Sequence, residues 1–202
     1  NVYLLSGGAA AGLVNPLKAQ FQAKHACTLH GTFSAVGAMK EALLQGTPCD
    51  VVILSQALVQ GLIDSGHVKA GSLRALGVVK TGIAVKHGTS YPAIATPADL
   101  QAAFRAAEGI YFPDPKLATA GIHFLKVLQT LGLDVELADR FRTFPNGATA
   151  MKAMAQATGQ VIGCTQVTEI KYTKGVDLVG VLPQEFELAT VYALGISSQA
   201  QQ

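Results

Sequence analysis

The chain opens with Val2-Tyr3-Leu4-Leu5-Ser6-Gly7-Gly8-Ala9, a short apolar run that passes into a loop of very small residues and then into a predicted helix. The same pattern recurs three times, with loops at Ser34-Ala35-Val36-Gly37, Ala118-Thr119-Ala120-Gly121 and Pro145-Asn146-Gly147-Ala148. Small side chains leave the main-chain N–H groups at a helix start accessible. These donors and the positive end of the helix dipole hold an anion without Arg or Lys. Four such loops, in two pairs, predict two lobes that face one ligand.

Apolar strands alternate with helical segments along the whole chain, which predicts an α/β fold made of βαβ units. Asp50–Leu54 is a continuous β-branched run, typical of a parallel sheet covered on both faces. Strands are expected at Val2–Leu5, Thr28–Phe33, Asp50–Leu54, Gly77–Val85, Gly109–Phe112, Phe141–Phe144, Val161–Thr165, Val176–Val181 and Val191–Ile196. Helices are expected at Leu13–Ala23, Ala35–Leu44, Gln56–Ser65, Pro97–Ala107, Ala120–Leu131 and Ala148–Ala157, with a helical turn at Thr168–Tyr172.

Two extended segments are expected to connect two halves of the chain. The first lobe would comprise residues 1–80 and 186–202, the second residues 81–185, with hinge crossings near 78–84 and 179–188. Each lobe would be a mostly parallel sheet flanked by helices. Ligands of open parallel sheets lie beyond the carboxyl ends of the strands, where all four small-residue loops fall, so a ligand cleft is predicted between the lobes.

Composition excludes several classes of protein. Half of the 202 residues are apolar and 14% are charged, which fits a packed α/β protein, and no run reaches the roughly 18 apolar residues of a membrane span. The net charge of +2 comes from scattered basic residues, so nucleic acid is not an expected partner. The chain begins at Asn1 without Met, so either a signal peptide has been removed or the chain is trimmed.

The sequence contains no recognisable catalytic, metal or cofactor motif. There is no C-x-x-C, no H-E-x-x-H, no G-x-S-x-G, and the five histidines have no metal-ligand spacing. Gly7 and Gly12 have the spacing of a phosphate-binding loop, but Leu13 and Val14 stand where Lys and Ser/Thr are required. Cys27 and Cys49 form either a disulfide or, as we favour, two thiols that pack as small apolar groups.

Several ordered segments together resemble the molybdate-binding protein family. They are Leu5-Ser6-Gly7-Gly8, Gly46-Thr47-Pro48-Cys49-Asp50-Val51-Val52-Ile53, Pro113-Asp114-Pro115 followed by Ala120-Gly121-Ile122, Gly163, and Val191-Tyr192. The resemblance runs over nearly the whole chain. It implies the two-lobed periplasmic-binding-protein fold of a solute-binding component of an ABC transporter. Expected partners are a small anionic solute and the membrane permease, and the protein is expected to be a periplasmic or other extracytoplasmic monomer, with a lipid anchor as one option.

The resemblance also assigns candidate ligand positions. One family serine corresponds to Ala9, a second to Ala35 or Val36, two main-chain donors to Ala120 and Ala148, and a tyrosine to Gln166. Ser6 and Ser34 lie close enough in sequence to replace the lost hydroxyls. The predicted site residues are Ser6, Gly7, Gly8, Ala9, Ser34, Ala35, Val36, Thr119, Ala120, Asn146, Ala148 and Gln166.

Each polar candidate also has a purely structural interpretation. Ser34 is a possible helix N-cap, Asn146 a turn residue, and Glu169, which lies outside the predicted site, fits a helix cap better than a ligand contact. Since a hydrogen bond to a charged group contributes about 1.5–3 kcal/mol, losing two hydroxyls and a phenol weakens tetrahedral oxyanion binding by several kcal/mol. The ligand is thus either a molybdate-like oxyanion or a small organic carboxylate.

Two other functions compete with solute capture. One is a ligand-sensing regulatory domain of the same fold, against which the absence of DNA-binding helices argues. The other is a small enzyme on this scaffold, which a close acid–base pair at the site would support. The relatives in this family continue beyond the last strand with helices that complete the first lobe. The present chain stops at Gln202, so it is either truncated or closes the lobe differently.

Overall fold

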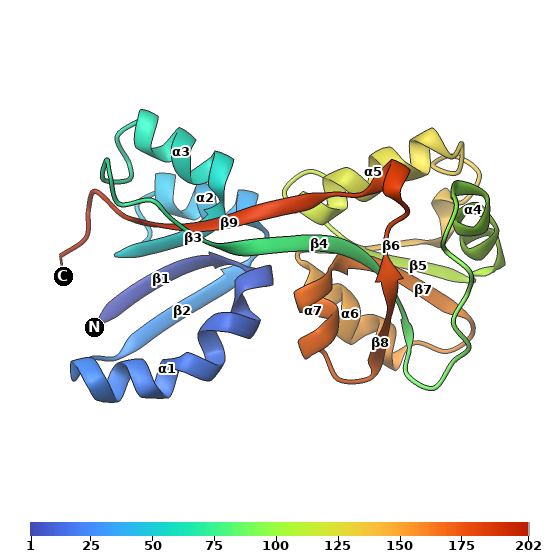
Figure 1. The fold of residues 1–202 in the computed structure, drawn as a ribbon, viewed down its shortest axis with the longest axis horizontal. Coiled ribbons are helices and arrows are strands. Elements are labelled where there is room, and N and C mark those ends of the chain that lie inside the picture. Colours follow the sequence, from blue (N-terminus) through green and yellow to red (C-terminus); the bar gives the residue numbers. More distant parts are fainter. Residues whose placement is uncertain (202) are drawn as a thin grey trace. The chain divides into compact units, whose positions relative to one another are not determined.

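The chain divides into two compact units, each with its own sheet and core. In the computed structural model, which describes residues 1–201, the first unit holds Asn1–Val79 and the chain from Thr190 onward, and the second holds Lys80–Ala189. Two strands carry the chain between them: β4 (Arg74–Lys86) leads out of the first unit and β9 (Ala189–Ile196) leads back (Figure 1). No helix within residues 1–201 is long and apolar enough to cross a membrane.

The first unit contains three parallel strands, each followed by a helical element. The strand order is β2 (Leu29–Ser34), β1 (Val2–Gly7), β3 (Val51–Ser55) and β9, which is antiparallel to β3. The 3-10 turn η1 (Gly8–Ala10) and α1 (Ala11–His25) follow β1, α2 (Val36–Leu44) follows β2, and α3 (Gln56–Asp64) follows β3. Fully buried apolar residues of β3 and α3, such as Leu54, Val59 and Leu62, hold this core together.

The apolar face of α1 is only partly covered. Leu13, Leu17 and Phe21 have the spacing of a buried helix face, but they are 48%, 51% and 40% exposed. They line an open apolar groove of about 410 Å³ with sheet residues such as Leu4 and Ile53. Ala11 is the one buried residue of this helix, so a four-residue repeat of large apolar residues does not guarantee burial here.

The second unit repeats the strand–helix pattern. Its strands β5 (Gly109–Pro113), β6 (Phe141–Phe144) and β7 (Val161–Gln166) are parallel, with β5 between the other two. β4 pairs antiparallel with β7 and with β8 (Val176–Val181). The helices are α4 (Pro97–Ala106), α5 (Thr119–Thr130), α6 (Gly147–Gln156) and α7 (Val167–Tyr172), with 3-10 turns η2 (Ala138–Arg140) and η3 (Gln184–Phe186).

The two faces of this second sheet carry separate cores. Because side chains alternate along a strand, Ile110 and Phe112 of β5 pack with α4 and α5, whereas Tyr111 packs with α6 and α7. On the first face Phe112 meets Phe124 edge-to-face, with ring centroids 5.1 Å apart. Covering helices on both faces explain why the strands read as nearly continuous apolar runs.

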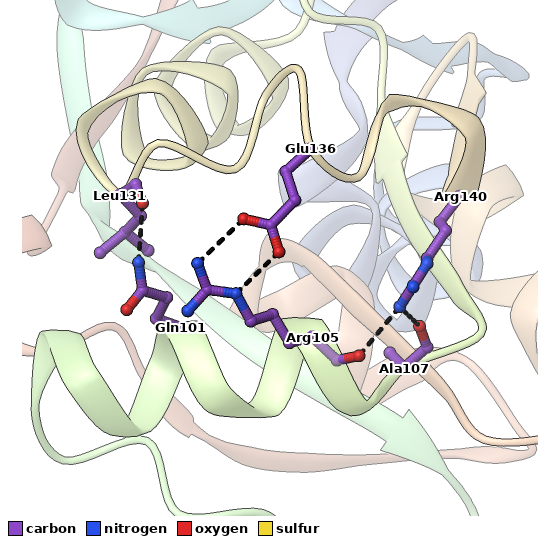
Figure 2. Close-up of polar contacts among 6 residues, drawn as sticks. All are labelled: Gln101, Arg105, Ala107, Leu131, Glu136 and Arg140. Carbon is purple, nitrogen blue, oxygen red and sulfur yellow. Dashed lines mark hydrogen bonds and ion pairs between the residues drawn. The ribbon is translucent and has the colours of Figure 1, made fainter.

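Polar contacts fasten α4 to the segment that follows α5 (Figure 2). Arg105 donates to both carboxylate oxygens of Glu136, at 2.8 and 2.9 Å. Arg140 donates to the carbonyl oxygens of Arg105 and Ala107 and so binds the C-terminal end of α4. The Arg105 guanidinium lowers the pKa of Glu136, and both side chains remain at the surface. This pair lies among exposed residues and serves below as a control.

The predicted fold class and order of elements are confirmed, with corrections at element ends. β1 continues to Gly7 rather than ending at Leu5, and η1 precedes a helix that starts at Ala11 rather than Leu13. α5 starts at Thr119, one residue before the predicted start, and α6 starts at Gly147. The expected short element after Asp134 is the turn η2. Each unit is thus an α/β sheet flanked by helices.

Candidate functional site

In the first unit, the small-residue loops meet at the carboxyl edge of the sheet. The parallel register pairs Gly7 with Ser34 and Ser6 with both Phe33 and Ile53, so the loops after β1 and β2 lie side by side. η1 and α2 begin at these loops, with N-caps Gly7 and Ala35, and neither has a side-chain cap. Their first main-chain N–H groups therefore have no capping side chain to accept their hydrogen bonds.

Side chains close around Gly7 and leave no room for a larger residue there. A Cβ at Gly7 would lie 2.7 Å from Val36 Cγ1 and 3.0 Å from Tyr192 Cε1. The buried Ser6 hydroxyl donates to the carbonyl oxygen of Gly7 at 2.9 Å, which turns it toward the main chain of the loop. The first unit thus presents main-chain donors in a setting of small and apolar groups.

In the second unit, the start of α5 is also without a side-chain cap. The Asp114 side chain accepts the N–H groups of Lys116 and Leu117 at 2.7 and 3.0 Å, and the Asp114 carbonyl accepts that of Ala118 at 3.1 Å. The N-cap Ala118 has no side chain that can accept a hydrogen bond. Internal acceptors therefore serve the loop as far as Ala118, and the N–H groups of Thr119 and Ala120 follow in the uncapped first turn.

The start of α6 is different, because protein groups already bind its donors. The Asn146 side chain accepts the N–H of Thr149 at 2.9 Å and acts as the N-cap. The carboxylate of Glu169 hydrogen-bonds to the main-chain N–H groups of Ala148 and Gln166. The predicted ligand donor Ala148 is thus engaged by a carboxylate of the same unit.

Glu169 is the most unusual ionisable group at this edge. It is 4% exposed, and Thr165 Oγ1 donates to its Oε2 at 2.6 Å. Burial raises the pKa of Glu169 to about 7, against the opposing effect of its three hydrogen-bond donors. A Cβ at Gly147 would overlap both Glu169 Oε2 and Thr165 Oγ1, so glycine at the first position of α6 is what admits the carboxylate.

Two buried polar groups lie near Gln166, the N-cap of α7. Thr81 of β4 pairs with Gln166 in the sheet, and its Oγ1 has no hydrogen-bond partner among residues 1–201. The Oγ1 of Thr168, in the first turn of α7, is likewise buried without a partner in the described chain. The carboxyl end of β7 therefore gathers several hydrogen-bonding groups in a small volume.

The geometry contains neither a disulfide nor a metal cluster within residues 1–201. Cys27, Cys49 and Cys164 are all free thiols, which confirms the interpretation that we favoured over a Cys27–Cys49 disulfide. Burial raises the pKa of Cys49 to about 11, so its thiol is protonated at neutral pH. No group of three His, Cys, Asp or Glu side chains in the described chain is arranged to hold a metal ion.

Over residues 2–202 the sequence matches the family described as bacterial extracellular solute-binding proteins. The chain belongs to this family. Solved structures share the fold of this solute-binding protein. The periplasmic molybdate-binding protein of Azotobacter vinelandii has a TM-score of 0.78 at 17% identity, and the match covers 100% of this chain and 87% of that one. The sulfate-binding protein of Mycobacterium tuberculosis H37Rv has a TM-score of 0.73 at 15% identity, covering 99% and 76%.

One curated relative carries the name of an enzyme. Aconitate isomerase of a Pseudomonas species is 26% identical over 168 residues, which is 81% of this chain. The solute-binding protein spans 61% of the length of that relative. The expected family is therefore confirmed, and the comparisons name three different anions without selecting one.

The predicted site residues gather at two sheet edges, one in each unit. Ser6, Gly7, Gly8, Ala9, Ser34, Ala35 and Val36 lie at the edge of the first unit; Thr119, Ala120, Asn146, Ala148 and Gln166 lie at that of the second. Ser34 is not the N-cap of α2, since Ala35 occupies that position. Sequence reasoning did not place Tyr192 at the site, although it lies beside Gly7; its position at the end of a returning strand was the available signal.

Proposed function

We propose that this protein is the solute-binding component of an ABC importer and captures a small anion on uncapped helix starts. One observation carries the proposal. η1, α2 and α5 begin without side-chain caps at the carboxyl edges of the two sheets. By contrast, α4 begins with a reciprocal capping box between Thr96 and Asp99, and α6 with Asn146. Main-chain donors withheld from protein acceptors are suited to an anion from solution.

We infer that both units contribute to one ligand site. The chain passes between the units twice, within β4 and within β9, as expected for two lobes that close about a hinge. The predicted hinge segments, 78–84 and 179–188, remain part of the proposal. Gly8, Ala9 and Val36 would supply donors from the first unit, and Thr119 and Ala120 from the second.

The residues at the helix starts favour a small organic carboxylate over a tetrahedral oxyanion. Ala9, Ala35 and Val36 carry no hydroxyl, and Gln166 stands where the molybdate-binding family has a tyrosine. Molybdate and sulfate binders among the structural neighbours support an oxyanion, whereas the relative named for aconitate supports a carboxylate. Because each missing hydrogen bond to a charged group costs about 1.5–3 kcal/mol, the carboxylate is the ligand that we propose.

The family also supports the remaining parts of the proposal. An extracellular solute-binding protein works outside the cytoplasm, in the periplasm for a cell with two membranes, and delivers its ligand to a membrane permease. We propose a monomer without cofactor, metal or nucleic acid. A regulatory domain of the same fold has less support, since the family description names solute binding.

A second candidate function is isomerisation of a small carboxylate, which the relative named aconitate isomerase favours. Such a reaction needs a proton donor and acceptor at the ligand. Proton NMR of cis- and trans-aconitate with the protein distinguishes the two functions. Interconversion of the two isomers would establish an enzyme, and unchanged spectra with measurable binding support solute capture.

A thermal-shift screen tests the proposed function. The panel contains molybdate, tungstate, sulfate, phosphate, acetate, succinate and aconitate, with neutral glucose and cationic lysine as controls. A bound anion at 100 times its dissociation constant stabilises the folded protein by about 2.7 kcal/mol. We expect such stabilisation from at least one carboxylate. A screen in which no anion raises the melting temperature would contradict the proposal.

A further inference from the structure

The inference begins from a carboxylate that occupies a helix start. Glu169 accepts hydrogen bonds from the N–H groups of Ala148 and Gln166 and from the hydroxyl of Thr165. The first two of these residues belong to the loop after β6 and to the end of β7, the strands on either side of β5. The protein thus holds its own anion at the sheet edge where the proposed site recruits an anion from solution.

No charged side chain compensates this carboxylate. Its neighbours in α6, α7, β7 and β8 are the hydrogen-bond donors already named and apolar residues such as Ile170. The charged groups on these elements are at the surface: Lys152 on α6, Lys171 on α7, and Asp177 on β8, which pairs with His87 at 2.9 Å. None of them contributes to the pKa shift of Glu169, whose cause is burial.

We propose that Glu169 makes anion binding proton-linked: it takes up a proton when an anion binds at the carboxyl edge of the second sheet. The proposal rests on the proposed function. An anion bound at α5 or at the end of β7 adds a negative charge at the edge where Glu169 has no cationic partner. Two negative charges in a poorly solvated region raise each other's proton affinity, so protonation of Glu169 removes the repulsion.

The proton moves to a defined place and restores a defined balance. Before binding, near neutral pH, the carboxyl of Glu169 is partly ionised and accepts the N–H groups of Ala148 and Gln166. On binding, a proton from solvent or buffer adds to one carboxylate oxygen, and the total charge of site plus anion falls in magnitude by one. No other bond forms or breaks.

Reciprocity sets the sign of the effect on affinity. Since binding takes up a proton, affinity falls as pH rises through the pKa of Glu169 in the free protein. If the anion raises that pKa by one unit from about 7, about half a proton is taken up at about pH 7.5. Affinity would then be about fivefold tighter at about pH 6 than at about pH 8.

Isothermal titration calorimetry tests the linkage. The intact chain is titrated with sulfate, molybdate and acetate, none of which gains a proton near neutral pH. Two buffers of different ionisation enthalpy are used, because the difference in heat measures proton uptake. Glu169→Gln removes the titrating group, and Glu136→Gln removes an exposed carboxylate of the same unit as a matched control.

We expect proton uptake and the fivefold pH effect in the wild-type protein and in Glu136→Gln, and neither in Glu169→Gln. Binding without proton uptake, or uptake that persists in Glu169→Gln, would overturn the inference and leave the proposed function standing. Absence of binding by any of the three anions at either pH would defeat the proposed function and this inference together.

A direct titration by carbon NMR keeps the inference testable if Glu169→Gln does not fold. The side-chain carboxyl of Glu169 in the wild-type protein is followed against pH with and without a saturating anion. A midpoint that rises when the anion binds supports the inference, and an unchanged midpoint refutes it.

Discussion

Replacing Gly121 by alanine is expected to destabilise the second unit by about 3 kcal/mol, because the new methyl group would overlap the main chain of the preceding loop. The colliding atoms are the carbonyl oxygens of Pro113 and Asp114, which cannot rotate away as a side chain can. Asp114 also accepts three main-chain hydrogen bonds in this loop, so moving it would break the support of the α5 start. Denaturant unfolding followed by circular dichroism measures the loss.

Gly61→Ala is the matched control. Gly61 also lies inside a helix, α3, but a Cβ there would meet no atom within 4 Å. Since alanine favours a helix over glycine by up to about 1 kcal/mol, this substitution is expected to stabilise the protein slightly. Equal effects of the two substitutions would show that the close approach at Gly121 is not tight.

The second large effect is a dependence of stability on pH that requires Glu169. Its pKa is about 7 in the folded protein and near the ordinary 4.5 when unfolded, so the folded state binds more protons between these values. The free energy of unfolding therefore decreases as pH rises from about 4.5 to about 7 and is constant above. The total loss is about 3 kcal/mol, at 1.36 kcal/mol for each unit of pKa difference.

Comparison with Glu169→Gln isolates this contribution. The exposed pair His87–Asp177 also titrates, but it is present in both proteins and cancels in the difference. Unfolding free energies are measured in urea at several pH values. We expect the difference between wild type and variant to change by about 3 kcal/mol in favour of the variant as pH rises. Parallel pH profiles would show that Glu169 has an ordinary pKa.

The sequence was sufficient to predict the strands and the loops that follow them. Asp50–Leu54 and Gly109–Phe112 are continuous apolar runs because helices cover both faces of each sheet, and such runs are legible without a structure. Small residues after the strands marked the helix starts of η1, α2 and α5 correctly. The proline and threonine at Thr96-Pro97 likewise located the start of α4.

Long-range contacts at the site could not be predicted. The repeat of small residues made the loop of Ala148 equivalent to the other three, whereas Glu169, twenty-one positions later by number, binds its N–H. The interpretation of Glu169 as a helix cap was right for Gln166 of α7, but the same carboxylate also serves α6. Leu13, Leu17 and Phe21 show the converse, since regular spacing cannot reveal how much apolar surface faces them.

Calorimetric titration of Thr119→Pro and Thr119→Ala, with the anion that gives the largest thermal shift, tests the central claim most directly. Proline is compatible with the first position of a helix and removes the N–H donor, and Ala118, at ψ 129°, already has the conformation required before proline. Alanine keeps the N–H and removes only the hydroxyl. If main-chain donors hold the anion, Thr119→Pro binds about 10- to 150-fold more weakly than Thr119→Ala. Equal affinities of the two variants would contradict the claim.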